Sequence, residues 1–251
     1  DVYIWLKDMA GNTDYRTRNV LLDAFNYDST PPTTTHQIQG TLGLNGWYTS
    51  SVNVNLTAQD NLSDVEQTLY RLGQGAWQAG AAITLTASGT YTISYRSSDR
   101  AGNEEPIRQA QIGIDKLPPT TTMQVSGTLG QNGWYTTPVQ ITLDAEDNVS
   151  SVGLTRYRVD GGAWLTGSTF PLETDGIHEI QFYSRDAAGN REATHTETVR
   201  VDVEPPLTLH SLEGLAGDDD WFRSSVTVTL TPTDLAAGPV ATLYQVDSGS
   251  W

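Results

Sequence analysis

Aspartates in turn-like segments are the residues of this sequence best suited to chemistry. Four of them recur in turn-like segments that contain Asn or Gly, at Asp60, Asp99, Asp147 and Asp186. Calcium prefers carboxylate and carbonyl oxygens, so these four are candidate calcium ligands. The alternative is that each Asp accepts hydrogen bonds from the backbone amides of its own turn, and no EF-hand spacing is present. Calcium is therefore the only candidate ion, and no other cofactor is indicated.

Tryptophans form the second set of candidates, because an exposed indole can stack on a sugar ring. Trp47 and Trp134 begin a segment with strand character, whereas Trp77 and Trp164 follow a tight glycine turn. These four are candidate carbohydrate-binding residues. Aromatic side chains also dominate the energetics of cores, and a framework residue recurs in every copy of a repeat. We therefore favour packing within or between domains as their role.

Catalytic residues are not grouped in this sequence. The four histidines are His36, His178, His195 and His210, and none recurs at the equivalent position of a neighbouring repeat. The spacing shows neither a serine–histidine–acid set nor a paired-carboxylate arrangement. We expect no enzymatic activity from this chain.

Charge and composition exclude several other classes of function. The 251 residues contain no cysteine, so disulfides, thiolate nucleophiles and cysteine-based zinc sites are absent. Thirty acidic residues against 14 basic ones give a net charge of −16. Such a surface repels phosphate backbones and anionic lipid, so we expect no nucleic-acid partner. No apolar run approaches the roughly 18 residues of a spanning helix, so no membrane span is expected in this segment.

An internal repeat organises the chain. Pro-Pro pairs recur at a spacing of 87 residues, at Pro31-Pro32, Pro118-Pro119 and Pro205-Pro206. Two copies aligned from Asp28 and Asp115 share 39 of 87 residues. The predicted boundaries are 1–27 for the last strands of an incomplete repeat plus a linker, 28–115 and 116–202 for complete repeats, and 203–251 for the first part of an incomplete repeat.

Each repeat has the pattern of a β-sandwich. In the first copy, short alternating segments predict strands at 33–39, 51–57, 67–72, 83–85, 90–97 and 107–114, with a short strand starting near Trp77. Seven short strands in about 87 residues, without helical periodicity, favour an immunoglobulin or fibronectin-type sandwich. Tyr91, Ile93 and Tyr95 should point inward. Tyr91 occupies the place of a corner tyrosine, which His178 replaces in the second copy.

The combined motifs resemble bacterial immunoglobulin-like repeats. The motifs are Pro-Pro-Thr-Thr-Thr, Asn-Gly-Trp-Tyr-Thr, Ala-x-Asp-Asn-x-Ser, Tyr-Arg, Gly-Ala-Trp and Asp-x-Ala-Gly-Asn. The resemblance implies tandem sandwiches in a large secreted or cell-surface protein, acting as a non-catalytic stalk, spacer, adhesin or filament. Because similar repeats occur beside carbohydrate-active domains, the alternative is a carbohydrate-binding accessory module of a secreted polysaccharide-active enzyme.

The linkers predict a rod. Proline fixes its own φ and biases the preceding residue toward extended geometry, so short Asp-x-x-Pro-Pro connections should limit bending. The expected partners are neighbouring repeats of the same longer chain, and a glycan or other surface ligand. Head-to-tail assembly, in which 203–251 of one molecule pairs with 1–23 of the next, is a further hypothesis.

Overall fold

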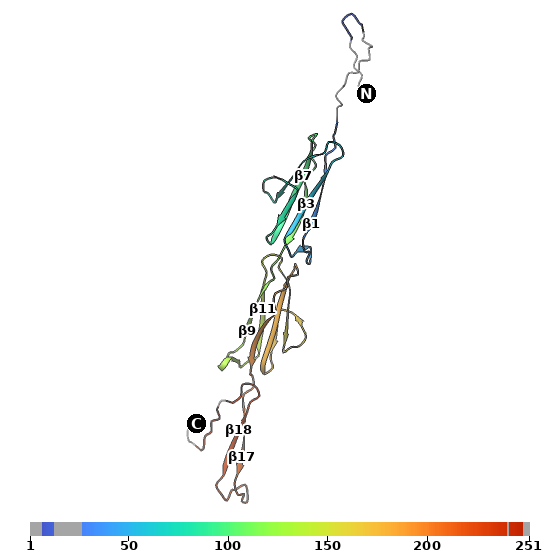
Figure 1. Cartoon of the computed structure of the whole chain (residues 1–251). Helices are drawn as coiled ribbons and strands as arrows, with labels where there is room; N and C mark the ends of the chain where they lie inside the picture. Colours follow the sequence, from blue (N-terminus) through green and yellow to red (C-terminus); the bar gives the residue numbers. More distant parts are fainter. Residues whose placement is uncertain (1–6, 13–26, 240, 248–251) are drawn as a thin grey trace.

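The chain is all-β, and its strands form sandwiches that follow one another in a line (Figure 1). The computed structural model describes residues 7–12, 27–239 and 241–247. Among these residues the only helical element is the 3-10 turn η1 (Gln131–Gly133), and no helix is long and apolar enough to cross a membrane. The prediction of immunoglobulin-like β-sandwiches is confirmed.

The first unit consists of two sheets built from eight strands. The strands are β1 (Thr33–Gln39), β2 (Trp47–Tyr48), β3 (Val52–Gln59), β4 (Val65–Leu72), β5 (Gln78–Ala79), β6 (Ala82–Leu85), β7 (Gly89–Asp99) and β8 (Arg108–Ile114). One sheet has the order β1-β3-β6 and the other β2-β8-β7-β4-β5. All pairs are antiparallel except β2 with β8, which is parallel. The chain crosses between sheets several times, as in immunoglobulin-type sandwiches.

The second unit repeats this topology. Its strands are β9 (Thr120–Ser126), β10 (Trp134–Tyr135), β11 (Val139–Glu146), β12 (Val152–Val159), β13 (Leu165–Thr166), β14 (Thr169–Leu172), β15 (Gly176–Asp186) and β16 (His195–Val201). The sheets have the orders β14-β11-β9 and β10-β16-β15-β12-β13. Every strand begins and ends 87 residues after its counterpart in the first unit.

Each unit has its own hydrophobic core between its two sheets. Because strand residues alternate between faces, β3 sends Val52, Val54 and Leu56 inward. Ile93 is fully buried and Tyr95 is 3% exposed, which confirms the predicted inward stripe of β7. The corresponding residues of β15 are also buried, with Ile180 at 0% and Phe182 at 2% exposure.

Beyond the second unit, β17 (Leu207–Glu213) and β18 (Thr227–Thr233) pair antiparallel. They correspond to β9 and β11 in sequence position. Most of their apolar side chains are exposed: Val228 is 58% exposed, whereas its counterpart Val54 is fully buried. The predicted strands at 1–23 fall mostly outside the described residues, although Asp8 accepts hydrogen bonds from Ala10 and Asn12 in a closed turn.

A hydrogen bond to a loop carbonyl closes one corner of each sandwich. The Tyr91 hydroxyl donates to the backbone oxygen of Ala87 at 3.0 Å. In the second unit the Nε2 atom of His178 lies 2.9 Å from the oxygen of Thr174, the equivalent carbonyl. The histidine therefore replaces the tyrosine in this bond. Its Nδ1 atom lies 2.8 Å from a carboxylate oxygen of Asp160, a contact that has no counterpart at Tyr91.

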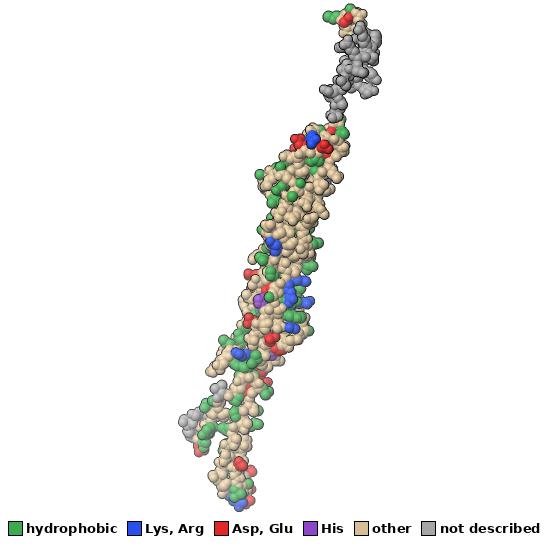
Figure 2. All heavy atoms as spheres, viewed as in Figure 1, with side chains coloured by type: hydrophobic (Ala, Val, Ile, Leu, Met, Phe, Trp, Pro, Cys, Tyr) green, Lys and Arg blue, Asp and Glu red, His purple; other side chains and the backbone are tan. Residues whose placement is uncertain are grey.

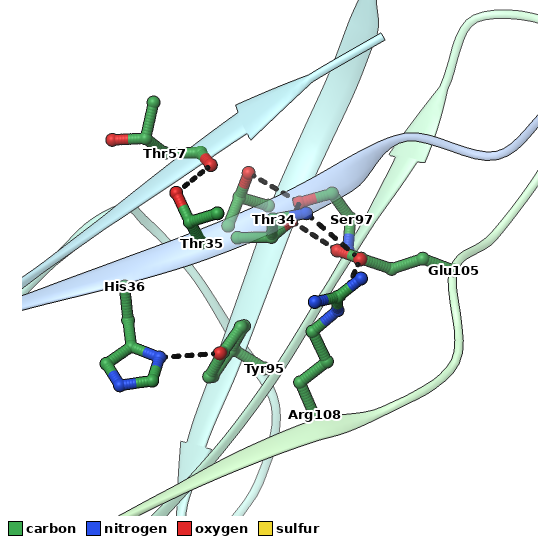
Figure 3. A network of polar contacts seen from close by, with 9 residues as sticks. Thr34, Thr35, His36, Thr57, Tyr95, Ser97, Glu105 and Arg108 are labelled. Carbon is green, nitrogen blue, oxygen red and sulfur yellow. Dashed lines mark hydrogen bonds and ion pairs between the residues drawn. The ribbon is translucent and has the colours of Figure 1, made fainter.

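A buried glutamate joins the two sheets of each unit, and it was not predicted. Glu105 is 4% exposed and accepts hydrogen bonds from the backbone amides of Thr34 and Ser97. It also accepts one from the Thr34 hydroxyl (Figure 3). Since a hydroxyl has one proton, Ser97 must donate to Thr34, and Thr68 must donate to Ser97. This ordered chain of hydroxyls links β4 and β7 to β1 of the opposite sheet.

The same chain runs through Thr155, Ser184, Thr121 and Glu192 in the second unit. The basic side chain beside the glutamate differs between units. Arg108 Nε lies 3.2 Å from Glu105 Oε2, whereas His195 Nε2 lies 3.1 Å from Glu192 Oε2.

Replacing Glu105 with alanine should destabilise the first unit, because two buried amides and a hydroxyl lose their acceptor. We expect the free energy of unfolding to fall by about 3 kcal/mol. Urea unfolding measures this loss. The matched control is Glu104→Ala, which removes a 54% exposed side chain paired with Arg96 and should cost less than about 1 kcal/mol. Equal effects of the two substitutions would contradict the proposed role of Glu105.

Candidate metal centres at the repeat junctions

Three aspartates come together at the start of the first unit. Asp28 lies in the linker before β1, Asp60 follows β3, and Asp99 ends β7. One carboxylate oxygen from each lies within 4.8 Å of the others. The structure therefore brings the predicted Asp60 and Asp99 together and adds a third carboxylate from the linker.

Most oxygens of this triplet accept hydrogen bonds from nearby turns. Asp99 accepts from the backbone and side-chain amides of Asn103, each at 2.8 Å. Asp28 and Asp60 both accept from the amide of Ser63. The exception is Asp60 Oδ1, which is buried and has no hydrogen-bond partner. A buried carboxylate oxygen without a partner carries a desolvation cost, so this atom is suited to coordinating a ligand.

Hydrogen bonding keeps two of these carboxyl groups ionised. Bonds from the Thr30 amide and from Ser63 lower the pKa of Asp28 below its usual value of 3.8. Burial alone would raise the pKa of Asp99, but the bonds from Asn103 outweigh burial and lower it. The negative charge of Asp28 acts against this lowering at Asp99.

The second unit repeats the triplet with Asp115, Asp147 and Asp186. Asp115 is 0% exposed and Asp186 is 1% exposed. Asp186 accepts hydrogen bonds from Gly189 and Asn190, and Asp147 accepts from Val149 and Ser151. None of the six aspartates forms an ion pair with a described residue.

The linker aspartates are the ligand candidates that sequence reasoning missed. Asp28 and Asp115 each stand three residues before a Pro-Pro pair and recur at the repeat spacing, which was the available signal. Asp202 occupies the same position before Pro205-Pro206. Asp202 and Asp234 accept hydrogen bonds from the turn 236–238 in the manner of the first two members of each triplet.

Chemically, each triplet fits a hard divalent cation. Calcium binds six to eight oxygens and accepts carboxylate ligands. Three carboxylates at such short separation repel one another without a cation, and the triplets contain no Lys, Arg or His. Asp28, Asp60 and Asp99 in the first unit, with Asp115, Asp147 and Asp186 in the second, would supply these ligands.

The second triplet lies at a tight junction between the two units. The amide of Asp115 donates to Tyr48 of the first unit at 2.8 Å, while its carboxylate accepts from Ser150 of the second unit at 3.1 Å. The loop that follows Asp186 also contacts the first unit. Leu44 N donates to Ala188 O at 2.7 Å, and Asn45 Nδ2 donates to Ala187 O at 2.9 Å.

The predicted tryptophan sites are not brought together. Trp47 and Trp77 lie at opposite edges of the five-stranded sheet, and both are half-buried. Trp47 packs against Gly113, while Trp77 lies beneath Arg71 and Arg96, at 4.9 Å and 5.2 Å from its ring. Trp134 and Trp164 repeat these positions and are also half-buried.

Acid should destabilise the first unit through its ionised aspartates. Because the folded pKa values of Asp28 and Asp99 are below 3.8, their contribution is present above pH 3.8 and is lost as pH falls through the folded values. Asn103→Ala removes a donor to Asp99, so acid unfolding should begin at higher pH. Hydrogen exchange in chelator, read separately for the two units, measures the shift. Asn61→Ala, an exposed position, is the control; a similar shift there would contradict the assignment.

Two curated proteins are similar to this chain over most of its length. Exoglucanase B from Cellulomonas fimi is 29% identical over 245 residues, covering 90% of the chain and 22% of that protein. Hyalin from Strongylocentrotus purpuratus is 30% identical over 251 residues, covering 92% of the chain and 19% of that protein. The chain therefore spans about a fifth of the length of these relatives.

No family model matches the sequence. Among solved structures, the fibronectin(III)-like modules of Clostridium thermocellum CbhA align with 66% of this chain and 94% of theirs. The sequence identity of that alignment is 16% and its TM-score is 0.31.

Proposed function

We propose that this chain is a non-catalytic spacer that holds other parts of a longer protein apart at a defined distance. The junction between the two units is the observation that carries this proposal. Asp115 is hydrogen-bonded to both units at once, and the loop containing Leu44 and Asn45 is docked on the loop after Asp186. These contacts oppose bending at the linker, so the two sandwiches behave as one rod.

A secreted polysaccharide-active enzyme is the setting that we favour. The support is the similarity to Exoglucanase B, whose length the chain covers only in small part. In this setting the chain lies outside the cell or on its surface, and it separates a catalytic region from another module. Roles as an adhesin or filament would use the same rod.

We further propose that calcium binds the aspartate triplets and stiffens each junction. Each triplet includes one linker residue, so a cation there would tie the linker to two loops of the following unit. The unpartnered Asp60 oxygen and the close approach of three carboxylates support this role.

A single glycine tests the spacer mechanism. A Cβ on Gly43 would lie 2.2 Å from the Ala188 oxygen, so Gly43→Ala should open the junction. We expect a shorter maximum dimension and greater flexibility in small-angle X-ray scattering, with little change in the stability of either unit.

Gly130→Ala is the matched control. The added Cβ meets a threonine methyl at 2.8 Å in both loops, Thr49 in the first unit and Thr136 in the second. Only Gly43 also meets the next unit. If both substitutions bend the rod equally, or neither does, the loop that contains Gly43 does not set the stiffness of the rod.

Calcium should raise the melting temperature if the triplets bind it. At a concentration about 100 times Kd, each site adds about 2.7 kcal/mol to the free energy of unfolding. Calorimetry with calcium and with chelator measures the effect. Asp60→Asn and Asp147→Asn together should abolish the shift, whereas Asp64→Asn, at a 78% exposed side chain, should preserve it. An unchanged melting temperature in the wild-type chain would exclude a structural calcium site.

A further inference from the structure

Four arginines lie on one face of the second unit and define what we call the arginine face. They are Arg156, Arg158, Arg185 and Arg191. Strand pairing sets Arg156 opposite Tyr183 and Arg185 opposite Leu154, so these four side chains share the outer face of the sheet. Arg191 reaches the same face, because its guanidinium lies 3.7 Å from the centre of the Tyr183 ring.

These arginines have no carboxylate partner. The ion pairs among the described residues of the second unit are His178–Asp160 and His195–Glu192. Arg156 and Arg185 form no side-chain hydrogen bond that the structure shows, and their Nε atoms are buried without an acceptor. The chain carries a net charge of −16, so acidic side chains that could pair with arginine are abundant in it. Figure 2 shows Lys and Arg side chains grouped on one side of this unit.

Two of the arginines are held in place by contacts that leave their charge uncompensated. Arg158 lies 4.8 Å from the centre of the Trp164 ring and donates from Nε to Gln181 at 2.6 Å. Arg191 stacks on Tyr183 and donates to the Thr194 hydroxyl at 2.8 Å. Groups fixed before binding lose less conformational entropy when a ligand arrives. The arginine face is therefore preorganised for an anion.

The first unit shows that the fold does not require this face. Leu69, Ser98 and Glu104 stand at the positions of Arg156, Arg185 and Arg191. Glu104 pairs with Arg96 at 2.6 Å and neutralises it. The same sandwich thus forms with Arg71 as the one uncompensated arginine at the positions of these four.

We propose that the arginine face binds a carboxylated polysaccharide, such as a polymer of uronic acids. Guanidinium groups match carboxylates with paired hydrogen bonds. Arg156 and Arg158 are alternate residues of β12 and stand roughly 6.8 Å apart, so these two cations lie in line for a linear polyanion. Arg158 covers one side of the Trp164 ring, and Arg191 covers one side of the Tyr183 ring. These contacts favour recognition of charge over stacking of neutral sugars on the rings. The choice of a polysaccharide rests on the proposed setting beside a polysaccharide-active enzyme.

Polygalacturonate is the probe, and its methyl-esterified form is the neutral control. The variant Arg156→Leu, Arg185→Ser and Arg191→Glu installs the residues of the first unit, which its sheet already accommodates. We expect calorimetric affinity for polygalacturonate to fall by roughly tenfold or more. Raising salt from about 0.05 M to about 0.5 M should weaken wild-type binding. The esterified polymer should not bind.

A charge-matched control separates the site from the overall charge of the chain. Lys7→Ser, Arg100→Leu and Arg223→Glu change the net charge equally but lie outside the arginine face, and should leave binding intact. The reciprocal variant Leu69→Arg, Ser98→Arg and Glu104→Arg should create a second site on the first unit. The reciprocal variant keeps the test informative if the triple variant of the arginine face unfolds.

Several results would overturn the proposal. Equal binding of the esterified polymer would indicate recognition of neutral sugar, and undiminished binding by the triple variant would exclude the arginine face. Arginine-dependent self-association or oligonucleotide binding, without polygalacturonate binding, would assign the face to another partner. Scattering measurements on Gly43→Ala test the spacer independently, so the two proposals can fail separately.

Discussion

The geometry of this rod depends on one linker aspartate that is bonded in two directions. Asp115 donates its backbone amide to Tyr48 in the unit before it and accepts from Ser150 in the unit after it. Because the residue is fully buried, water does not compete well for these bonds. Pro118 and Pro119 follow and restrict the remaining linker torsions. A flexible tether of similar length would leave both units free to reorient.

The docking contacts and the aspartate triplet use the same loop of the second unit. Residues 186–190 present Asp186 to the triplet and the carbonyls of Ala187 and Ala188 to the preceding unit. The hydrogen bond from Asn190 to Asp186 holds this loop in shape. It therefore also fixes the carbonyls that accept hydrogen bonds from Leu44 and Asn45. A cation at the triplet would restrain both surfaces of this loop. Stiffness and metal affinity are consequently coupled in the proposed spacer.

Local patterns predicted the strands because each unit repeats a strong period-two alternation with clear turn residues. The strand predicted at 33–39 matches β1, and the inward stripe at Ile93 and Tyr95 is buried as expected. The glutamate network was missed because a glutamate in a polar loop is usually exposed. Only the packing of β1 against β7 across the two sheets brings the donors Thr34 and Ser97 to Glu105. Asp28 was missed for the same reason, since its partners are 32 and 71 residues away.

Divergence between two copies of one framework separates the residues that the fold requires from those that are free to change. The hydroxyl chain, the aspartate triplet and the corner bond persist in both units, although His178 replaces Tyr91 at the corner. These features join strands or loops through hydrogen bonds, so a change in one residue leaves its partners without a hydrogen bond. The outer sheet face carries no such constraint, and there Leu69, Ser98 and Glu104 give way to three arginines. A shared scaffold can thus keep the framework of the rod while the outer faces of its units differ in charge.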